Sequence, residues 1–431
     1  MKCFLYIPPF ACEGTKVNNI AEIRIGGLTL AQRACRSIQK AEFEEIIIIK
    51  PDTLKLDKDP KITIPVLNIG YDTRAKEIAP LLLEDHASEP CALCTLDGMV
   101  SPECLKMRPI GADVRISVNN APTGIYFMTA HTFQRILKTD ECFYAFENEI
   151  TDTFAAPDKT VYHRIISAED IKIAKDKLTK SLRKPLGRDA DGLVAYFINR
   201  PCSLQISKRL ANTFVTPNMI TAFGLILGIA AAPLIATGDP WLMALAVVLW
   251  QTSSMVDGVD GELARMRMSP SHSGEWFDTV ADDITNIAFL AGLGHGIAQI
   301  SQNPIYFYVA AGISGLMVIS CSWFYREFVK MGIASHNHFE WGFETENKEN
   351  KNNEHRNPIR KIMDLIAGGF AWIAKRDFYT FLIMCLVIIG AFYAPLYYAA
   401  YFIMLIGAAF VGIGGISALS LRAIRKARKK V

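Results

Sequence analysis

Two features of secreted proteins are missing from this sequence. Its ten cysteines show no spacing typical of a disulfide framework, and Cys91-x-x-Cys94 has neither a second pair nor histidines close by. We therefore expect ordinary buried thiols at these positions rather than a zinc or redox site. Lys2 is followed by only a short apolar stretch, which favours a strand over a signal peptide. The net charge of +3 is small for 431 residues, so the composition does not indicate a nucleic-acid partner.

Charged residues are also scarce in the second half of the chain. The sequence is 51% hydrophobic and 21% charged, and residues 1–180 have the mixed composition of a soluble domain. Long apolar runs dominate from residue 215 onward, and a membrane-spanning helix needs about 20 mostly apolar residues. Six such runs predict an all-α six-helix transmembrane bundle over 215–425. They cover about 217–237, 241–262, 278–299, 305–327, 377–393 and 396–420.

Lysine and arginine are absent from three connections between these runs, at 237–240, 300–304 and 393–396. The connections on the other side are rich in basic residues, and six more follow between Arg422 and Lys430. Because cytoplasmic loops carry the excess of Lys and Arg, we expect an integral membrane protein with both termini in the cytoplasm. The basic tail is expected to contact anionic lipid headgroups.

Two further segments flank or interrupt the apolar runs. Residues 190–214 mix aromatic and aliphatic side chains with Arg200, Lys208 and Arg209. This pattern predicts an amphipathic helix on the inner leaflet, with a plain linker as the alternative. The polar stretch 344–357 predicts a cytoplasmic loop.

The most informative motif is Asp257-x-x-Asp260-Gly261-x-x-Ala264-Arg265, followed after eight residues by Gly274-x-x-x-Asp278-x-x-x-Asp282. The aspartates are three apart in the first pair and four apart in the second, so each pair lies on one face of a helix. The turn between the two helices brings them back antiparallel, and all four carboxylates can converge. Acids beside apolar sequence need a partner or a function. Surface acids that cap helix ends are the plainer alternative, but the fixed spacing of the whole motif argues against it.

The residue types in this motif suit phosphate chemistry. Carboxylate oxygens bind Mg²⁺ or Mn²⁺, which often complete their coordination with substrate phosphates. Gly261 and Gly274 let a ligand approach the backbone closely, and Arg265 can bind a phosphate with two hydrogen bonds. Metal ions on a pyrophosphate, together with one carboxylate that acts as a base, make a phosphotransfer site.

The same residues resemble the signature of the CDP-alcohol phosphatidyltransferases, and the similarity extends over roughly 190–425. Thr216-Pro217-Asn218-x-x-Thr221, at the start of the first apolar run, is similar to that family as well. The resemblance implies two divalent ions, Mg²⁺ or Mn²⁺, held by Asp257, Asp260, Asp278 and Asp282. It implies a CDP pocket lined by Gly261, Ala264, Arg265, Gly274, Asn218 and Thr221. It also implies that Asp282 deprotonates the acceptor hydroxyl, which attacks the β-phosphorus while CMP leaves; Asp283 lies outside the signature and receives no role.

A second anionic group on the donor or the acceptor would need cations nearby. Arg326, Lys375 and Arg376 lie at the predicted inner ends of the fourth and fifth runs, where they are candidates to bind an acceptor phosphate. The excess of basic residues expected at cytoplasmic helix ends explains them equally well.

The first 180 residues predict an α/β domain. Short apolar strands are expected at Phe4–Ile7, Ile46–Ile49, Ile64–Leu67, Ala92–Leu96 and Ile125–Met128. One helix is expected over Leu28–Lys40, and Ser167-x-x-Asp170 is close to a capping box that opens another.

The order of these elements resembles the sugar-phosphate nucleotidyltransferases. Ile25-Gly26-Gly27-Leu28 and Thr123-Gly124-Ile125-Tyr126 are similar to stretches of that family, and Asp97 lies near one of the metal aspartates that the resemblance implies. The phosphate-binding loop is replaced by Phe10-Ala11-Cys12-Glu13-Gly14-Thr15-Lys16, where Glu13 would repel a triphosphate. Ile166 stands where the second metal aspartate is expected. We therefore expect a degenerate, non-catalytic nucleotidyltransferase-like domain.

The whole chain resembles enzymes that make CDP-inositol and then use it to make phosphodiesters of inositol phosphate. The resemblance implies transfer of a phosphoalcohol group from CDP-diacylglycerol or a CDP-inositol-like donor to an acceptor hydroxyl at a lipid membrane. A homodimer is compatible with the sequence. Two alternatives stay open: a bifunctional enzyme whose first domain still makes the CDP-alcohol from CTP, and a non-catalytic membrane transporter or scaffold.

Overall fold

The structure is a computed structural model, and it describes residues 1–9, 12–15, 17–71, 89–107, 109, 111–119, 121–137, 150–157, 160–183, 191–335, 376–409 and 412. It divides into two compact units. The first unit contains Met1–Arg183 and two short stretches, Ala211–Thr213 and Arg265–Ser269. The second unit contains Lys184–Leu210, Phe214–Ala264 and Pro270–Val431. The predicted loop at 344–357 and the basic tail lie outside the described residues.

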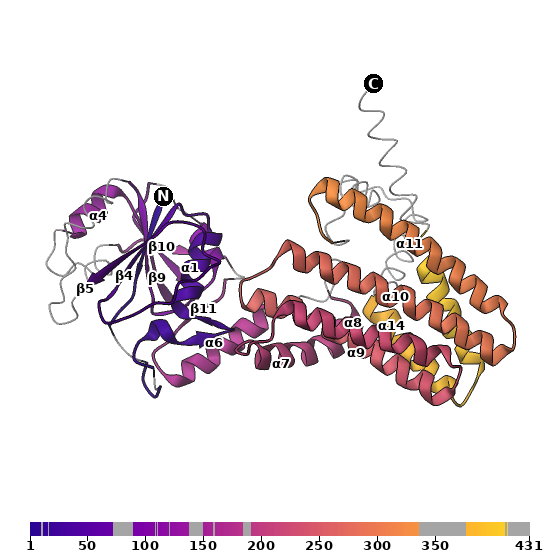
Figure 1. The fold of residues 1–431 in the computed structure, drawn as a ribbon. Coiled ribbons are helices and arrows are strands. Elements are labelled where there is room, and N and C mark those ends of the chain that lie inside the picture. Colours follow the sequence, from indigo (N-terminus) through magenta and orange to yellow (C-terminus); the bar gives the residue numbers. More distant parts are fainter. Residues whose placement is uncertain are drawn as a thin grey trace, which may run out of the picture. The chain divides into compact units, whose positions relative to one another are not determined.

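The first unit is built on a seven-stranded mixed sheet with the strand order β10-β8-β9-β6-β1-β4-β5 (Figure 1). The strands are β1 (Lys2–Tyr6), β4 (Glu45–Pro51), β5 (Val66–Tyr71), β6 (Cys91–Thr95), β8 (Val114–Val118), β9 (Ala121–Met128) and β10 (Thr153–Ala155). β1 pairs in parallel with β4 and β6, whereas β9 runs antiparallel to β6 and β8. The five predicted strands are confirmed to within two residues, apart from the one expected at Ile64–Leu67, which ends later, at Tyr71.

Helices cover both faces of this sheet, because neighbouring residues of a strand point to opposite sides. Ile48 of β4 belongs to the buried cluster that includes α1 (Leu30–Lys40). Its neighbour Ile47 belongs to the opposite cluster, which includes Phe133 of α4 (Ala130–Leu137). Burial on both faces explains why the central strand β4 is apolar at successive positions.

The helix starts of the first unit follow local capping rules. α1 opens with a capping box between Thr29 and Gln32, and α6 (Ala168–Ser181) opens with the predicted one between Ser167 and Asp170. Other short elements are η1 (Ile20–Glu22), β2 (Arg24–Ile25), β3 (Leu28–Thr29), β7 (Gly98–Val100), α3 (Pro102–Lys106) and β11 (Tyr162–Arg164). The helix predicted from Leu28 therefore begins two residues later, after β3.

The paired cysteines of the first unit are part of its core. Cys91 and Cys94 are both about 1% exposed on β6, and burial raises the pKa of both thiols. The prediction of ordinary buried thiols is confirmed.

The second unit consists of helices in its described part. They are η2 (Ala195–Asn199, a π-helical turn), α7 (Arg200–Leu210), α8 (Pro217–Ala236), α9 (Pro240–Met266), α10 (His272–Ser301), α11 (Ile305–Met331), α14 (Arg376–Gly390) and a helix over Pro395–Ala409. Thr216 caps α8, since its side chain accepts a hydrogen bond from the backbone N–H of Met219. Ser271 caps α10 in the same way through the N–H of Gly274.

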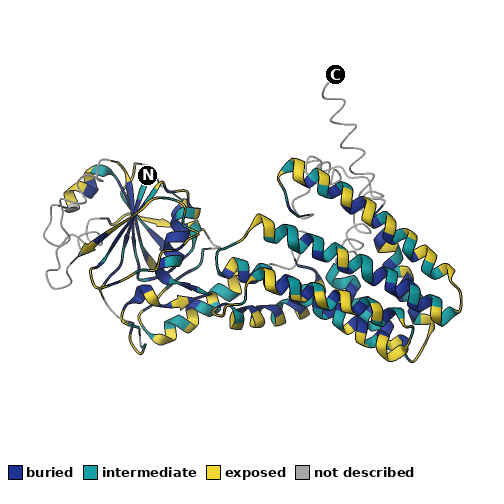
Figure 2. Cartoon of the chain, in the orientation of Figure 1, coloured by how far each residue is buried: buried dark blue, intermediate teal, exposed yellow. Residues whose placement is uncertain are grey.

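Membrane association is supported by three helices of the described chain, α8, α9 and α11, which are long and apolar enough to cross a bilayer. Exposed positions recur along them (Figure 2), and on α8 they include Phe223 and Ile226. Exposed apolar faces of this kind indicate contact with lipid. α10 carries the acidic motif and is not among the three, and α14 has only 15 residues. Each of the six predicted runs contains a helix, but a six-span bundle stays a prediction.

Candidate metal centre

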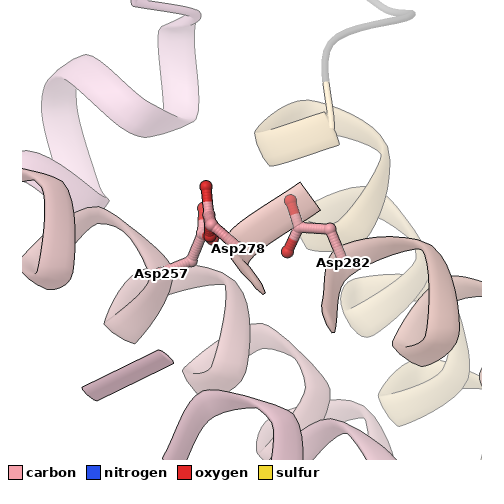
Figure 3. Close-up of side chains that lie close together, drawn as sticks. All are labelled: Asp257, Asp278 and Asp282. Atoms are coloured by element: carbon pink, nitrogen blue, oxygen red, sulfur yellow. The ribbon is translucent and has the colours of Figure 1, made fainter. Parts of the chain in front are cut away.

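Three of the four predicted metal ligands come together in the second unit. α9 carries Asp257, and α10 carries Asp278 and Asp282 (Figure 3). One carboxylate oxygen from each residue lies within 4.8 Å of the other two. All three residues are half-buried, so their charges are only partly solvated. Carboxylates at this distance repel one another, and a bound cation would offset that repulsion.

This group fits a divalent cation. Asp278 Oδ1 is buried and accepts no hydrogen bond from any described residue, although buried carboxylate oxygens normally have a donor. Oxygen ligands from two helices suit Mg²⁺ or Mn²⁺, and we would place such an ion on Asp257, Asp278 and Asp282. When bound, the ion supplies charge stabilisation to phosphoryl oxygens.

Asp260, the fourth predicted ligand, makes other contacts. Its side chain is buried, and Thr221 of α8 donates its hydroxyl proton to Asp260 Oδ2 at 2.5 Å. The backbone N–H of Gly261 is directed at Oδ1. Asp260 is therefore not part of the three-carboxylate group that the structure assembles, and its role as a metal ligand stays a prediction. The same contacts bring together two of the predicted CDP-binding residues, Thr221 and Gly261.

Two more predicted CDP-binding residues lie next to each other. A Cβ atom built on Gly274 would lie 3.3 Å from Asn218 Oδ1 and 2.8 Å from Ser271 Oγ. A larger residue at position 274 would therefore crowd the cap of α10. The remaining two occupy the last turn of α9, where Ala264 is half-buried and Arg265 is exposed.

Arg376, at the start of α14, reaches the acidic group. Its guanidinium forms an ion pair with Asp282, and its Nη1 lies 3.7 Å from Asp257 Oδ2. The other two candidates for binding an acceptor phosphate are not brought there. Lys375 lies outside the described residues, and Arg326 is exposed on α11 without an ion pair to any residue that the structure describes.

Comparison with known families identifies the domain that carries this centre. Residues 214–413 match the CDP-alcohol phosphatidyltransferase family. The chain carries a CDP-alcohol phosphatidyltransferase domain. The match contains all four aspartates of the motif and ends beyond α14. The resemblance stated from the motif is thereby confirmed.

Curated relatives share part of this chain. Proteins named bifunctional IPC transferase and DIPP synthase are 40% identical over 125 residues in Aquifex aeolicus and 36% identical over 155 residues in Thermococcus kodakarensis. These matches cover 29% and 36% of this chain but 27% and 33% of the relatives, so the chain spans about a third or less of the curated relatives it matches. A ceramide phosphoethanolamine synthase of Drosophila melanogaster is 33% identical over 89 residues, which cover 19% of this chain and 23% of that protein.

Two solved structures are each similar to about half of this chain. Phosphatidylinositol phosphate synthase of Mycobacterium tuberculosis with CDP-DAG bound is 16% identical, with a TM-score of 0.31, and covers 52% of this chain and 92% of that one. The inositol-1-phosphate CTP transferase from T. maritima is 12% identical, with a TM-score of 0.31, and covers 41% of this chain and 94% of that one.

The CDP-alcohol phosphatidyltransferase domain also contains polar contacts that the sequence did not predict. Glu262, inside the motif, is fully buried and accepts hydrogen bonds from Ser203 and Ser207. Asp283 accepts a hydrogen bond from Tyr325 Oη at 2.6 Å. The signal for Glu262 was its charge among apolar residues, which requires a partner. Those partners lie 59 and 55 residues away along the chain, so no local pattern could identify them.

The first unit does not fit the metal site that its resemblance implies. Asp97 forms an ion pair with Arg164, with Nε and Oδ2 3.4 Å apart. Ile166, at the place of the second aspartate, is 57% exposed. The backbone N–H of Glu13 donates to the carbonyl of Ile166, and Phe10, Ala11 and Lys16 of the altered loop lie outside the described residues. A single carboxylate that already has a cation partner does not fit a nucleotide-bound metal ion.

Proposed function

We propose that this chain is a membrane enzyme that transfers a phosphoalcohol group from a CDP-alcohol to an acceptor hydroxyl and releases CMP. The observation that best supports the proposal is the convergence of Asp257, Asp278 and Asp282 inside a CDP-alcohol phosphatidyltransferase domain. Two Mg²⁺ or Mn²⁺ ions, held by these residues with Asp260, would neutralise the pyrophosphate of the donor.

In this proposal Asp282 is the general base. It takes the proton of the acceptor hydroxyl, whose oxygen then forms a bond to the β-phosphorus of the donor. The bond between that phosphorus and the bridging oxygen breaks, and CMP leaves with the electron pair. Arg376, which is paired with Asp282, would hold the carboxylate in place and bind an anionic group of the acceptor.

The substrates are proposed by class. The donor is CDP-diacylglycerol or a CDP-inositol-like alcohol, and the acceptor is an alcohol or an alcohol phosphate such as inositol phosphate or glycerol phosphate. The names of the relatives, bifunctional IPC transferase and DIPP synthase, favour the inositol compounds. We further propose that the site opens to the cytoplasm, with both termini on that side, because the basic residues gather there. A homodimer stays a prediction.

Release of CMP tests the proposal directly. The purified full-length chain, with Mg²⁺ and a panel of CDP-alcohols and acceptors, is expected to form CMP from at least one pair. Asp282→Asn should abolish CMP formation, whereas Asp239→Asn should not, because Asp239 only caps α9 and asparagine caps equally well. Unchanged CMP formation in Asp282→Asn would refute the base. Metal binding without CMP from any donor would instead favour a transporter or scaffold.

The bifunctional alternative is favoured by the names of the relatives alone. It requires the first unit to join CTP to an alcohol phosphate with release of pyrophosphate. The ion pair between Asp97 and Arg164 and the exposed Ile166 argue against it. Pyrophosphate release by the full-length chain from CTP and inositol phosphate would revive it, provided that Asp97→Asn removes that release.

A further inference from the structure

Glu262 is a fully buried charge with an unusually complete set of partners. It is 0% exposed on α9. Ser203 donates to Oε1 and Ser207 donates to Oε2, each at 2.7 Å, and Arg200 Nη1 donates to Oε1 at 2.8 Å. All three donors come from α7, so one carboxylate joins α7 to the helix that carries Asp257.

The rest of the guanidinium of Arg200 is also occupied. Nε and Nη2 bind the two carboxylate oxygens of Asp191 at 2.9 and 3.1 Å. A fork of this kind fixes the orientation of the guanidinium as well as its position. Asp191, Arg200 and Glu262 therefore form one buried network, which we call the Glu262 network together with Ser203 and Ser207.

α7 approaches α9 at the turn that carries the metal ligands. A Cβ atom on Gly258 would lie 3.4 Å from Arg200 Nη1 and 3.6 Å from Ser203 Oγ. Gly258 and Glu262 are four residues apart, so they share the face of α9 that meets α7. Asp257 precedes Gly258 directly, and Asp260 lies between the two contact points. The backbone on which both acids are mounted is thus held from the side of α7.

The same segment also contacts α14. The backbone N–H of Ala195 donates to Asp377 Oδ2 at 2.7 Å, and a Cβ atom on Gly192 would collide with that carboxylate. Asp377 directly follows Arg376, the residue paired with Asp257 and Asp282. Residues 191–210 therefore contact both the helix turn that carries Asp257 and the helix end that carries Arg376.

We propose that the Glu262 network positions the acidic group for metal binding, so that Arg200, Ser203, Ser207 and Glu262 are positioning residues of the active site. This inference rests on the proposed function, because it treats the three carboxylates as a metal centre. It assigns residues 191–210 a task beyond lying at the membrane surface: they fix the separation between the acids and Arg376. Outer partners of metal ligands typically change metal affinity by roughly 10–100-fold.

The affinity of the full-length chain for Mn²⁺, measured by electron paramagnetic resonance, tests the inference without any substrate. The double variant Ser203→Ala/Ser207→Ala removes two donors with little change in volume, and we expect Mn²⁺ to bind roughly tenfold more weakly or worse. The variant Ser203→Thr/Ser207→Thr keeps both hydroxyls and should bind Mn²⁺ nearly as the unaltered chain does. Ser314→Ala, which removes a buried serine hydroxyl from α11, is the matched control.

Thermal unfolding of each variant shows that the comparison is made on folded protein, and Glu262→Gln is added where it folds. A double alanine variant with unchanged Mn²⁺ affinity, even if it unfolds at a lower temperature, would reduce the network to a structural role and overturn the inference. If the unaltered chain binds Mn²⁺ but forms no CMP, the proposed function fails, and the affinity comparison still decides the inference.

Discussion

The guanidinium of Arg376 on α14 is paired with the carboxylate of Asp282 on α10. The same group lies 3.7 Å from Asp257, so one cation faces two of the three clustered carboxylates. A guanidinium that binds carboxylates in this way presents donors that also suit a phosphate. An acceptor phosphate entering the site would therefore find its cation already beside the proposed base.

The first prediction concerns this arginine. Arg376→Gln removes a charge-assisted contact to the acceptor phosphate, and such contacts contribute about 1.5–3 kcal/mol. We expect the KM for a phosphorylated acceptor to rise roughly tenfold or more, with a smaller change for an acceptor that has no phosphate. CMP release measured against acceptor concentration checks this. Lys330→Gln, which removes an exposed charge from α11, is the control. Equal effects on both kinds of acceptor would contradict the role.

The second prediction concerns the carboxylate whose oxygen has no donor. Asp278→Asn removes a charge and a hard oxygen ligand from the group, so the affinity for Mn²⁺ should fall by roughly 100-fold or more, beyond the effect of outer partners. Titration of the full-length chain followed by electron paramagnetic resonance measures it. Asp239→Asn makes the same chemical change at the start of α9 and should leave the affinity unaltered. An affinity unaffected by Asp278→Asn would remove this residue from the metal centre.

The third prediction concerns Thr221 and Asp260. Thr221→Val replaces the hydroxyl by a methyl group of similar size and leaves a buried carboxylate oxygen without its side-chain donor. Loss of a donor to a buried acceptor costs about 1–3 kcal/mol of folding free energy. We expect a lower melting temperature of the full-length chain in detergent, whereas Thr221→Ser should stay close to the unaltered protein. If valine and serine have the same effect, the hydroxyl is not what stabilises Asp260.

The acidic group could be predicted from sequence because its geometry is local. Spacings of three and four residues put each pair of aspartates on one helix face, and the short turn between α9 and α10 brings the two helices back toward each other. Capping is local as well, which is why the start of α6 at Ser167 was predicted correctly. The placement of Asp260 was not resolved in advance, because its partner Thr221 lies 39 residues away on another helix.

Contacts between distant segments could not be predicted in this way. No periodicity of the sequence pairs Arg376 with Asp282 or Arg200 with Glu262, since both pairs depend on how helices pack. The strand order has the same origin: β1 lies between β4 and β6, and crossovers rather than neighbours in sequence decide this. Sequence patterns therefore predicted most elements and the site's chemistry, while the supporting network emerged only from the three-dimensional arrangement.

The last prediction concerns pH and the first unit. The backbone N–H groups of Ser167 and Ile166 donate to Asp170, and these hydrogen bonds hold the pKa of its carboxyl below the ordinary value. A lowered pKa in the folded state means that the stabilisation is complete above the unfolded value of about 4 and is lost as the pH falls through the folded value. The melting temperature of the first unit within the full-length chain should therefore drop between about pH 5 and pH 2. Asp170→Asn should be less stable at pH 7 and should show a smaller drop over that range, because its side chain cannot titrate. Glu169→Gln removes a charge from the same helix turn without removing the cap and serves as the control. Equal pH dependence in Asp170→Asn and the unaltered chain would show that the capping carboxylate does not stabilise the start of α6 through its charge.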